Sequence, residues 1–198
     1  MTDFKNSETA VNLMRAFAGE SMARNRYIFA ASQAKKQNLH IIEAAFLFTA
    51  NQEKEHAEIF YNHLKSLAGE TIDIQAGYPI DHSQSVLELL KSARHNEYEE
   101  HSPIYPAFGD KAKAEGFPAI ASSFYQIAAI EKTHGDRFGM LADLLASNSL
   151  FKESSTTKWL CLNCGHVHEG PNAPATCPVC FHDQGYFIRL SMAPYTKC

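Results

Sequence analysis

The stretch that decides the fold is EKEHAEIF, at Glu53–Phe60, together with its near copy EKTHGDRF, at Glu131–Phe138. Glutamate, lysine, histidine and phenylalanine recur at the same places in both copies. Each copy lies inside a longer segment whose apolar residues repeat every three or four positions, which predicts a helix with one buried face. The glutamate and histidine of each copy stand on that face, where a helix normally carries apolar side chains.

Two further segments show the same interruption of an apolar face by glutamate. The patterns and the Gly- and Pro-containing turns between them predict four long helices, over residues 8–37, 39–67, 84–115 and 118–146. Glu20 lies on the apolar stripe of the first helix, and Glu97 and Glu100 lie on that of the third. The connection over residues 68–85 is long for a loop, so we expect it to cross over the bundle.

Buried carboxylates at these positions need a reason, because an unpaired buried charge costs several kcal/mol. An isolated Glu-x-x-His is usually a solvated surface pair, but two copies on matching stripes argue for metal binding. Spacing by three puts each glutamate and its histidine on one helix face. One glutamate from each of two helices and Glu-x-x-His from each of two others form the ligand set of ferritin-like dimetal bundles. Carboxylate and imidazole together favour iron or manganese. The candidate ligands are Glu20, Glu53, His56, Glu97, Glu100, Glu131 and His134.

A second metal site is predicted near the C-terminus. Cys161-x-x-Cys164 and Cys177-x-x-Cys180 have the spacing of a tetrahedral four-thiolate site, and the fifth cysteine, Cys198, is expected to be incidental. Taken alone, this pattern favours a structural zinc ribbon. Zinc has no redox chemistry, however, and a redox-active dimetal site needs electrons, so the context favours a one-iron carrier.

The composition divides the chain and limits its location. We expect a helical bundle over residues 1–147, a Ser- and Thr-rich linker over 148–157 and a small metal-bound β domain over 158–198. The 198 residues carry a formal net charge of −4 and no basic cluster, which gives no indication of nucleic-acid binding. No signal peptide or membrane span is evident, so a cytoplasmic protein is expected.

The motifs jointly resemble those of the rubrerythrins over essentially the whole chain. They are Gly19-Glu20, Glu53-x-x-His56, Glu97-x-x-Glu100 followed by Ile104-Tyr105-Pro106, Glu131-x-x-His134, and CLNCGHVHEGPNAPATCPVC from Cys161 to Cys180. The resemblance implies a mainly α fold, in which a ferritin-like four-helix bundle with a long crossover precedes a rubredoxin-like domain. It implies a di-iron (Fe–O–Fe) centre and a mononuclear Fe(Cys)4 site.

The resemblance also implies an activity, namely a non-haem di-iron peroxidase that reduces hydrogen peroxide to water. Electrons would come from NAD(P)H through rubredoxin or an NAD(P)H-dependent reductase, and would pass through the rubredoxin-like iron. A homodimer is implied, with the one-iron site of one subunit near the di-iron site of the other. A ferroxidase is the alternative enzyme, and a helical binding protein with a zinc ribbon is the non-enzyme alternative.

The same resemblance assigns roles to individual residues. Glu53 and Glu131 would bridge the irons, with Glu20 and Glu100 as terminal ligands. His134 would bind one iron, and Glu97 and His56 would exchange as ligands of the other. The remaining matches are two tyrosines beside the ligands, Tyr27 and Tyr105. Tyr27 follows Glu20 by two helical turns, so it could donate a hydrogen bond to a ligand carboxylate. The alternative role for Tyr27 is that of a core aromatic residue whose hydroxyl is satisfied elsewhere.

Three residues depart from the family pattern without removing a ligand. Pro103 adds a second proline close to Pro106, so the third helix is expected to bend or end soon after its ligands. His166 stands where an aromatic residue is usual and is expected to affect the potential or add a pH dependence. Phe181 follows the second cysteine pair where glycine is common.

Overall fold

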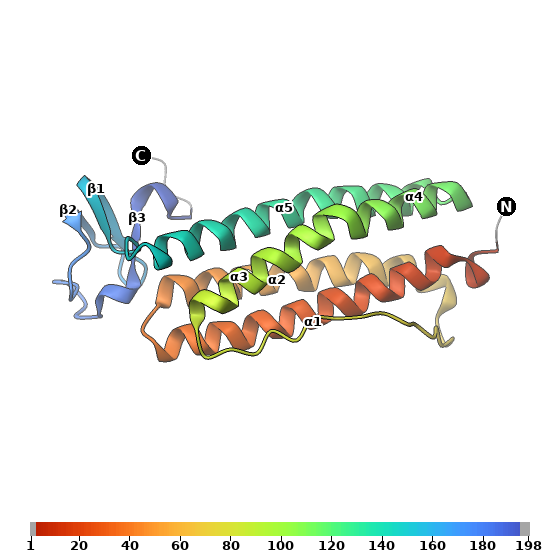
Figure 1. The fold of residues 1–198 in the computed structure, drawn as a ribbon, viewed down its shortest axis with the longest axis horizontal. Helices are drawn as coiled ribbons and strands as arrows, with labels where there is room; N and C mark the ends of the chain where they lie inside the picture. Colours follow the sequence, from red (N-terminus) through yellow and green to blue (C-terminus); the bar gives the residue numbers. More distant parts are fainter. Residues whose placement is uncertain (1–2, 195–198) are drawn as a thin grey trace.

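The computed structural model describes residues 3–194, which form a long helical bundle with a small β domain at one end (Figure 1). Cys198 lies outside the described residues. The bundle is built from α1 (Glu8–Lys36), α2 (His40–His63), α3 (Val86–Glu99), α4 (Tyr105–Glu115) and α5 (Pro118–Ala146). Side-chain caps begin two of these helices, because the hydroxyls of Ser7 and Ser85 accept hydrogen bonds from backbone N–H groups of α1 and α3. None of the helices within residues 3–194 has the length and apolar content that a membrane span requires.

The helices pack in two groups (Figure 1). Helix α1 packs against α2, while α3 and α4 both pack against α5. As predicted, the connection over residues 68–85 is a crossover, and it runs along α1. Hydrogen bonds fix it there, since Arg15 Nε donates to the Gln75 carbonyl at 3.2 Å and Tyr78 Oη donates to the Arg15 carbonyl at 2.9 Å.

The apolar core is divided into two clusters. One lies toward the β domain and includes Tyr27, Phe46 and Phe138, whose rings contact one another. The other lies toward the opposite end and includes Phe60 and Phe124. The acidic residues of the predicted site lie in sequence between the parts of each helix that feed these two clusters. Packing on both sides therefore fixes the four helices where the charged side chains meet.

The prediction of one continuous third helix over 84–115 was wrong, but the expected break at Pro103 was confirmed. Helix α3 ends at Glu99, a π-helical segment η3 spans Glu100–Ile104, and α4 follows. Ser102 has φ −163° and ψ 119°, which is extended rather than helical. The ring of a proline clashes with a helical conformation of the residue before it, which accounts for the break.

The β domain is a three-stranded antiparallel sheet. Its strands are β1 (Lys152–Cys161), β2 (Val167–Asn172) and β3 (Phe187–Arg189), in the order β2-β1-β3. Strand β1 already begins at Lys152, so residues 152–157 of the segment expected to be a linker lie in a strand. The limits of the two domains otherwise remain a prediction.

Arg189 fixes the junction between α5 and β1. Its side chain is buried and donates hydrogen bonds to three backbone carbonyls before and within the start of β1, those of Ser149, Leu150 and Lys152. Its guanidinium also pairs with Glu153 and lies 5.0 Å from the centre of the Trp159 ring. One side chain therefore ties the last strand of the β domain to its point of attachment.

Replacing Gly185 by alanine is expected to displace the β domain from the bundle. A Cβ on Gly185 would lie 1.8 Å from the backbone oxygen of Asn38, which cannot move like a flexible side chain. The neighbouring contact, in which the Tyr186 ring stacks on His40 at 3.9 Å, should be lost with it. Faster amide hydrogen exchange at residues 38–43 would show this. The control is Gly77→Ala, where an added Cβ meets nothing within 4 Å and exchange should not change.

Candidate metal centres

Four helices bring six of the predicted ligands together at mid-bundle. Their ligand atoms form two groups, each within 4.8 Å. The first group is Glu20, Glu53, His56 and Glu131, and the second is Glu53, Glu97, Glu131 and His134. Glu53 and Glu131 belong to both groups, so the arrangement suits two ions that share two carboxylates. Each glutamate and its histidine come from one helix face, as the spacing by three predicts.

The ligand atoms lack the partners that buried polar groups normally have. Within the described part of the chain, the atoms without a hydrogen-bond partner include Glu97 Oε2, both carboxylate oxygens of Glu131 and both ring nitrogens of His134. His134 Nδ1 nevertheless lies 2.8 Å from Glu131 Oε2 and 3.0 Å from Glu53 Oε1. Close contact without hydrogen-bond geometry is what atoms converging on a shared ion would show. The donor set therefore fits a pair of metal ions.

The electrostatics of the site also favour bound cations. Burial, together with the neighbouring carboxylates, raises the pKa of Glu20 and of Glu97 well above the ordinary value. Burial alone would lower the pKa of His134, but its contacts with Glu131, Glu53 and Glu97 outweigh burial and raise that pKa to about 12. In the absence of metal, the site therefore retains protons that bound cations would replace.

Two buried tyrosines contact ligand carboxylates. Tyr105 Oη donates a hydrogen bond to Glu20 Oε1 at 2.6 Å, and Tyr27 Oη donates to Glu97 Oε1. Both hydroxyls are thus satisfied by ligands from another helix. Such contacts orient a carboxylate and leave its other oxygen for a metal.

Glu100 lies outside both groups of converging atoms. It is the first residue of η3, and its Oε1 points toward α1, 3.8 Å from where a Cβ on Gly19 would lie. Burial and the charges of Glu131 and Glu53 raise its pKa, so it remains close enough to interact with the site. Its role as a terminal ligand remains a prediction.

Arg137 lies near the site, within reach of the charges of Glu97 and Glu53, and the sequence reasoning missed it. Its Nη1 donates to Thr49 Oγ1 at 2.7 Å and to Gln52 Oε1 at 3.2 Å, which ties α5 to α2. The spacing could have revealed it, because Arg137 follows His134 by three residues. Thr49 likewise precedes Glu53 by four, one turn along α2.

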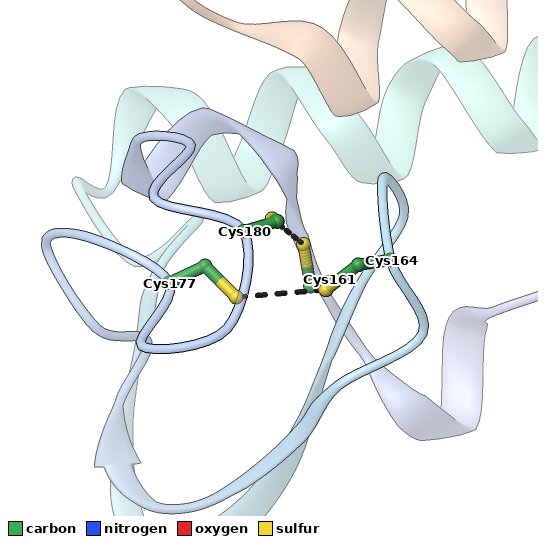
Figure 2. A group of neighbouring side chains, drawn as sticks. All are labelled: Cys161, Cys164, Cys177 and Cys180. Carbon is green, nitrogen blue, oxygen red and sulfur yellow. Dashed lines mark hydrogen bonds between the residues drawn. The ribbon is translucent and has the colours of Figure 1, made fainter.

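The four cysteines of the β domain converge as predicted (Figure 2). The Sγ atoms of Cys161 and Cys180 are 3.8 Å apart, and those of Cys164 and Cys177 are 3.7 Å apart. These separations are too long for disulfides and suit sulfurs placed around one ion. A backbone N–H of His182 lowers the pKa of Cys180 to about 6. Burial raises the pKa of Cys161, while burial and the neighbouring thiols outweigh a backbone N–H of His166 and raise the pKa of Cys164 to about 12. Without an ion, the four sulfurs therefore share few negative charges.

The departure at Phe181 has a structural consequence. Phe181 has φ +61°, in the left-handed region, and its side chain is 80% exposed. The equivalent turn after the first cysteine pair carries Gly165, at φ +77°. Both residues close their turns through backbone hydrogen bonds to the first cysteine of each pair, at 2.8 Å for Gly165 and 3.0 Å for Phe181. Phe181 therefore adopts the same turn as Gly165, although a positive φ is unfavourable for a residue with a bulky side chain.

A helical bundle with two converging carboxylate–histidine groups, joined to a four-cysteine β domain, defines a ferritin-like dimetal protein with a rubredoxin-like domain. Two family models match successive parts of the chain. Residues 11–142 match the family model described as rubrerythrin, and residues 159–188 match the model described as the rubredoxin-like domain of rubrerythrin. The chain belongs to the rubrerythrin family.

Individual relatives agree over almost their full lengths. The chain is 44% identical to a rubrerythrin of Clostridium perfringens, over 94% of this chain and 96% of that protein. It is 39% identical to a rubrerythrin of Nitratidesulfovibrio vulgaris, over 97% of this chain and 99% of that protein. A structure of fully reduced nigerythrin is 26% identical, with a TM-score of 0.62, covering 96% of this chain and 94% of that one.

Family membership identifies the cofactors. The chain combines a di-iron domain with a rubredoxin-like iron domain, and the carboxylate–histidine groups and the four cysteines could hold these irons. The family has an iron-dependent function related to peroxide.

Proposed function

We propose that this chain reduces hydrogen peroxide to water at its di-iron centre. The observation that carries the proposal is the sharing of Glu53 and Glu131 between two ligand groups, in a chain that also carries a four-cysteine site. The reaction breaks the O–O bond and consumes two electrons and two protons for each peroxide. The iron pair, when bound, supplies Lewis acidity and two closely spaced one-electron donors.

The side chains around the metals have distinct roles in this proposal. Glu53 and Glu131, which belong to both ligand groups, would hold both ions, and Glu20, Glu100 and His134 would be further ligands. Glu97 and His56 would be alternative ligands for one ion. Two tyrosines orient two of the carboxylates through their hydroxyls, Tyr105 acting on Glu20 and Tyr27 on Glu97.

Electron supply completes the proposal. Cys161, Cys164, Cys177 and Cys180 would hold a single iron, and the chemistry that it would supply is transfer of one electron at a time toward the di-iron site. Its donor would be rubredoxin or an NAD(P)H-dependent reductase, and the working form would be a homodimer in which the four cysteines of one subunit lie near the partner's di-iron site.

The proposal is tested with the full-length, iron-loaded protein, reduced without oxygen. Hydrogen peroxide should reoxidise it within seconds and restore the colour of the one-iron site, and NADH with rubredoxin and its reductase should sustain turnover. The Cys177→Ser variant should lose that turnover but keep the single reoxidation of its di-iron centre. Reoxidation that is faster with dioxygen, with iron deposited and no peroxide turnover, would instead indicate a ferroxidase.

A further inference from the structure

A cavity of about 430 Å³ opens beside the metal site. It lies between α1, the crossover over residues 68–85 and the break that separates α3 from α4. Its walls are largely apolar, and they include Ala16, Tyr78, Pro79, Ile104 and Phe108. The η3 segment contributes Glu100, Pro103 and Ile104 to the lining, so the break in the helix forms part of the cavity wall.

The inner end of the cavity is formed by residues of the metal site. Glu100 and Tyr105 both line it, and Tyr105 donates its hydrogen bond to Glu20. Gly19 lines it as well, and with no side chain it leaves the Tyr78 ring and the Glu100 carboxylate close to α1. A molecule in the cavity would therefore touch side chains that contact the di-iron centre.

The two arginines at the cavity, Arg15 and Arg26, are already paired with acidic residues, and the other charged residues of its lining, Glu99 and Glu100, are acidic. Arg15 Nη1 lies 2.5 Å from Glu8 Oε1 and 2.7 Å from Asn12 Oδ1, while Arg26 Nε lies 3.3 Å from Asp81 Oδ2. These pairings leave little positive charge for an anionic ligand. An uncharged ligand with an apolar body and one polar end fits the walls better.

The volume is large for hydrogen peroxide, which is little bigger than a water molecule with its share of about 30 Å³ in the liquid. We propose that this cavity binds a small organic hydroperoxide, with its organic group against the apolar walls and its O–O–H end at Glu100. The inference rests on the proposed function and extends its substrates. Reduction of R–O–O–H breaks the O–O bond, takes up two electrons and two protons, and gives R–OH and water. The electrons come from a reduced rubredoxin-type carrier, as for hydrogen peroxide.

The test compares two substrates in three versions of the full-length, iron-loaded protein. Ala107 lines the cavity on the exposed side of α4, so Ala107→Phe should fill its mouth without disturbing the core. Ala114 is exposed on the same helix, two turns further on and outside the cavity, so Ala114→Phe is the matched control. We expect Ala107→Phe to lower kcat/KM for cumene hydroperoxide roughly tenfold or more, as loss of an apolar binding site does, while hydrogen peroxide turnover is unchanged. Ala114→Phe should change neither.

A binding measurement tests whether the cavity is occupied, independently of peroxide reduction. Cumyl alcohol, the unreactive product, should shift NMR signals of residues around Tyr78 in the wild type and in Ala114→Phe, but not in Ala107→Phe. The inference would be overturned if Ala107→Phe lost kcat/KM equally for both peroxides, or if the wild type did not turn over cumene hydroperoxide. It would also be overturned if cumyl alcohol shifted the NMR signals of Ala107→Phe as it does those of the wild type. Absence of hydrogen peroxide turnover in the wild type would instead refute the proposed function, and the alcohol would still report whether the cavity binds.

Discussion

Replacing Glu131 by alanine is expected to remove both metal ions and to lower peroxide reduction by roughly 1,000-fold or more, the scale on which losing a shared catalytic group acts. Glu131 contributes to both ligand groups, and neither of its oxygens has a hydrogen-bond partner among residues 3–194. Its loss therefore deprives two ions of a ligand at once. Iron content, measured on the purified full-length variant, should fall from three irons per chain to the single iron of the cysteine site.

Substitutions of the histidines should behave differently from Glu131→Ala. His56 belongs to one ligand group and His134 to the other, so His56→Ala and His134→Ala should each weaken one ion first. Titration with iron should then show one tight and one weak site in the bundle. Asp143→Ala, at an exposed acid on the same helix as Glu131, should keep both ions. Retention of two bundle irons by Glu131→Ala would show that the ligand groups do not share this carboxylate.

The sequence predicted the bundle and its ligands because both depend on local periodicity. The repeated Glu-x-x-His fixes a helix face, and the apolar residues around Glu53 and Glu131 fix which way that face points. The same reasoning placed four cysteines around one ion from their spacing. These features need no knowledge of how distant segments pack.

The features that escaped prediction depend on contacts between distant segments. Pro103 indicated a break, but the π-helical form of η3, which begins at Glu100, was not predicted. Arg189 meets the carbonyls of Ser149 and Leu150 only once the β domain has folded against the end of α5. The role of Gly185 depends in the same way on the position of Asn38. No periodicity in the sequence encodes such contacts.

Metal removal should make the stability of the protein depend strongly on pH. The free energy of unfolding of the metal-free protein is expected to fall as the pH rises from about 6.5 to 9, while the iron-loaded protein should change little. The carboxylates of Glu131 and Glu53 outweigh the effect of burial and raise the pKa of His56 to about 9. A raised histidine pKa contributes stability that is fully present below the unfolded value of 6.5 and is lost as the pH rises through 9.

The carboxylates with raised pKa act in the same direction. Glu20 and Glu97 contribute stability that is fully present below the ordinary value of 4.5 and is lost as the pH rises through their raised values. Glu53 acts oppositely, because its contacts with His134 and His56 outweigh burial and lower its pKa to about 2. Its contribution is present above 4.5 and is lost only as the pH falls toward 2, outside the window considered. At about 1.4 kcal/mol per pKa unit, His56 alone should account for about 3 kcal/mol between pH 6.5 and 9.

Urea denaturation of the metal-free and iron-loaded proteins at pH 6.5, 7.5 and 9 would measure this dependence. The Glu97→Gln variant provides a sharper test, because glutamine keeps the shape of the side chain but removes a carboxylate whose ionisation burial opposes. It should stabilise the metal-free protein at pH 9 relative to the wild type, yet weaken binding of one iron. The control is Glu58→Gln, at an exposed position on α2, which should change neither quantity. A metal-free wild type whose stability is level between pH 6.5 and 9 would contradict the view that bound cations replace retained protons in this site.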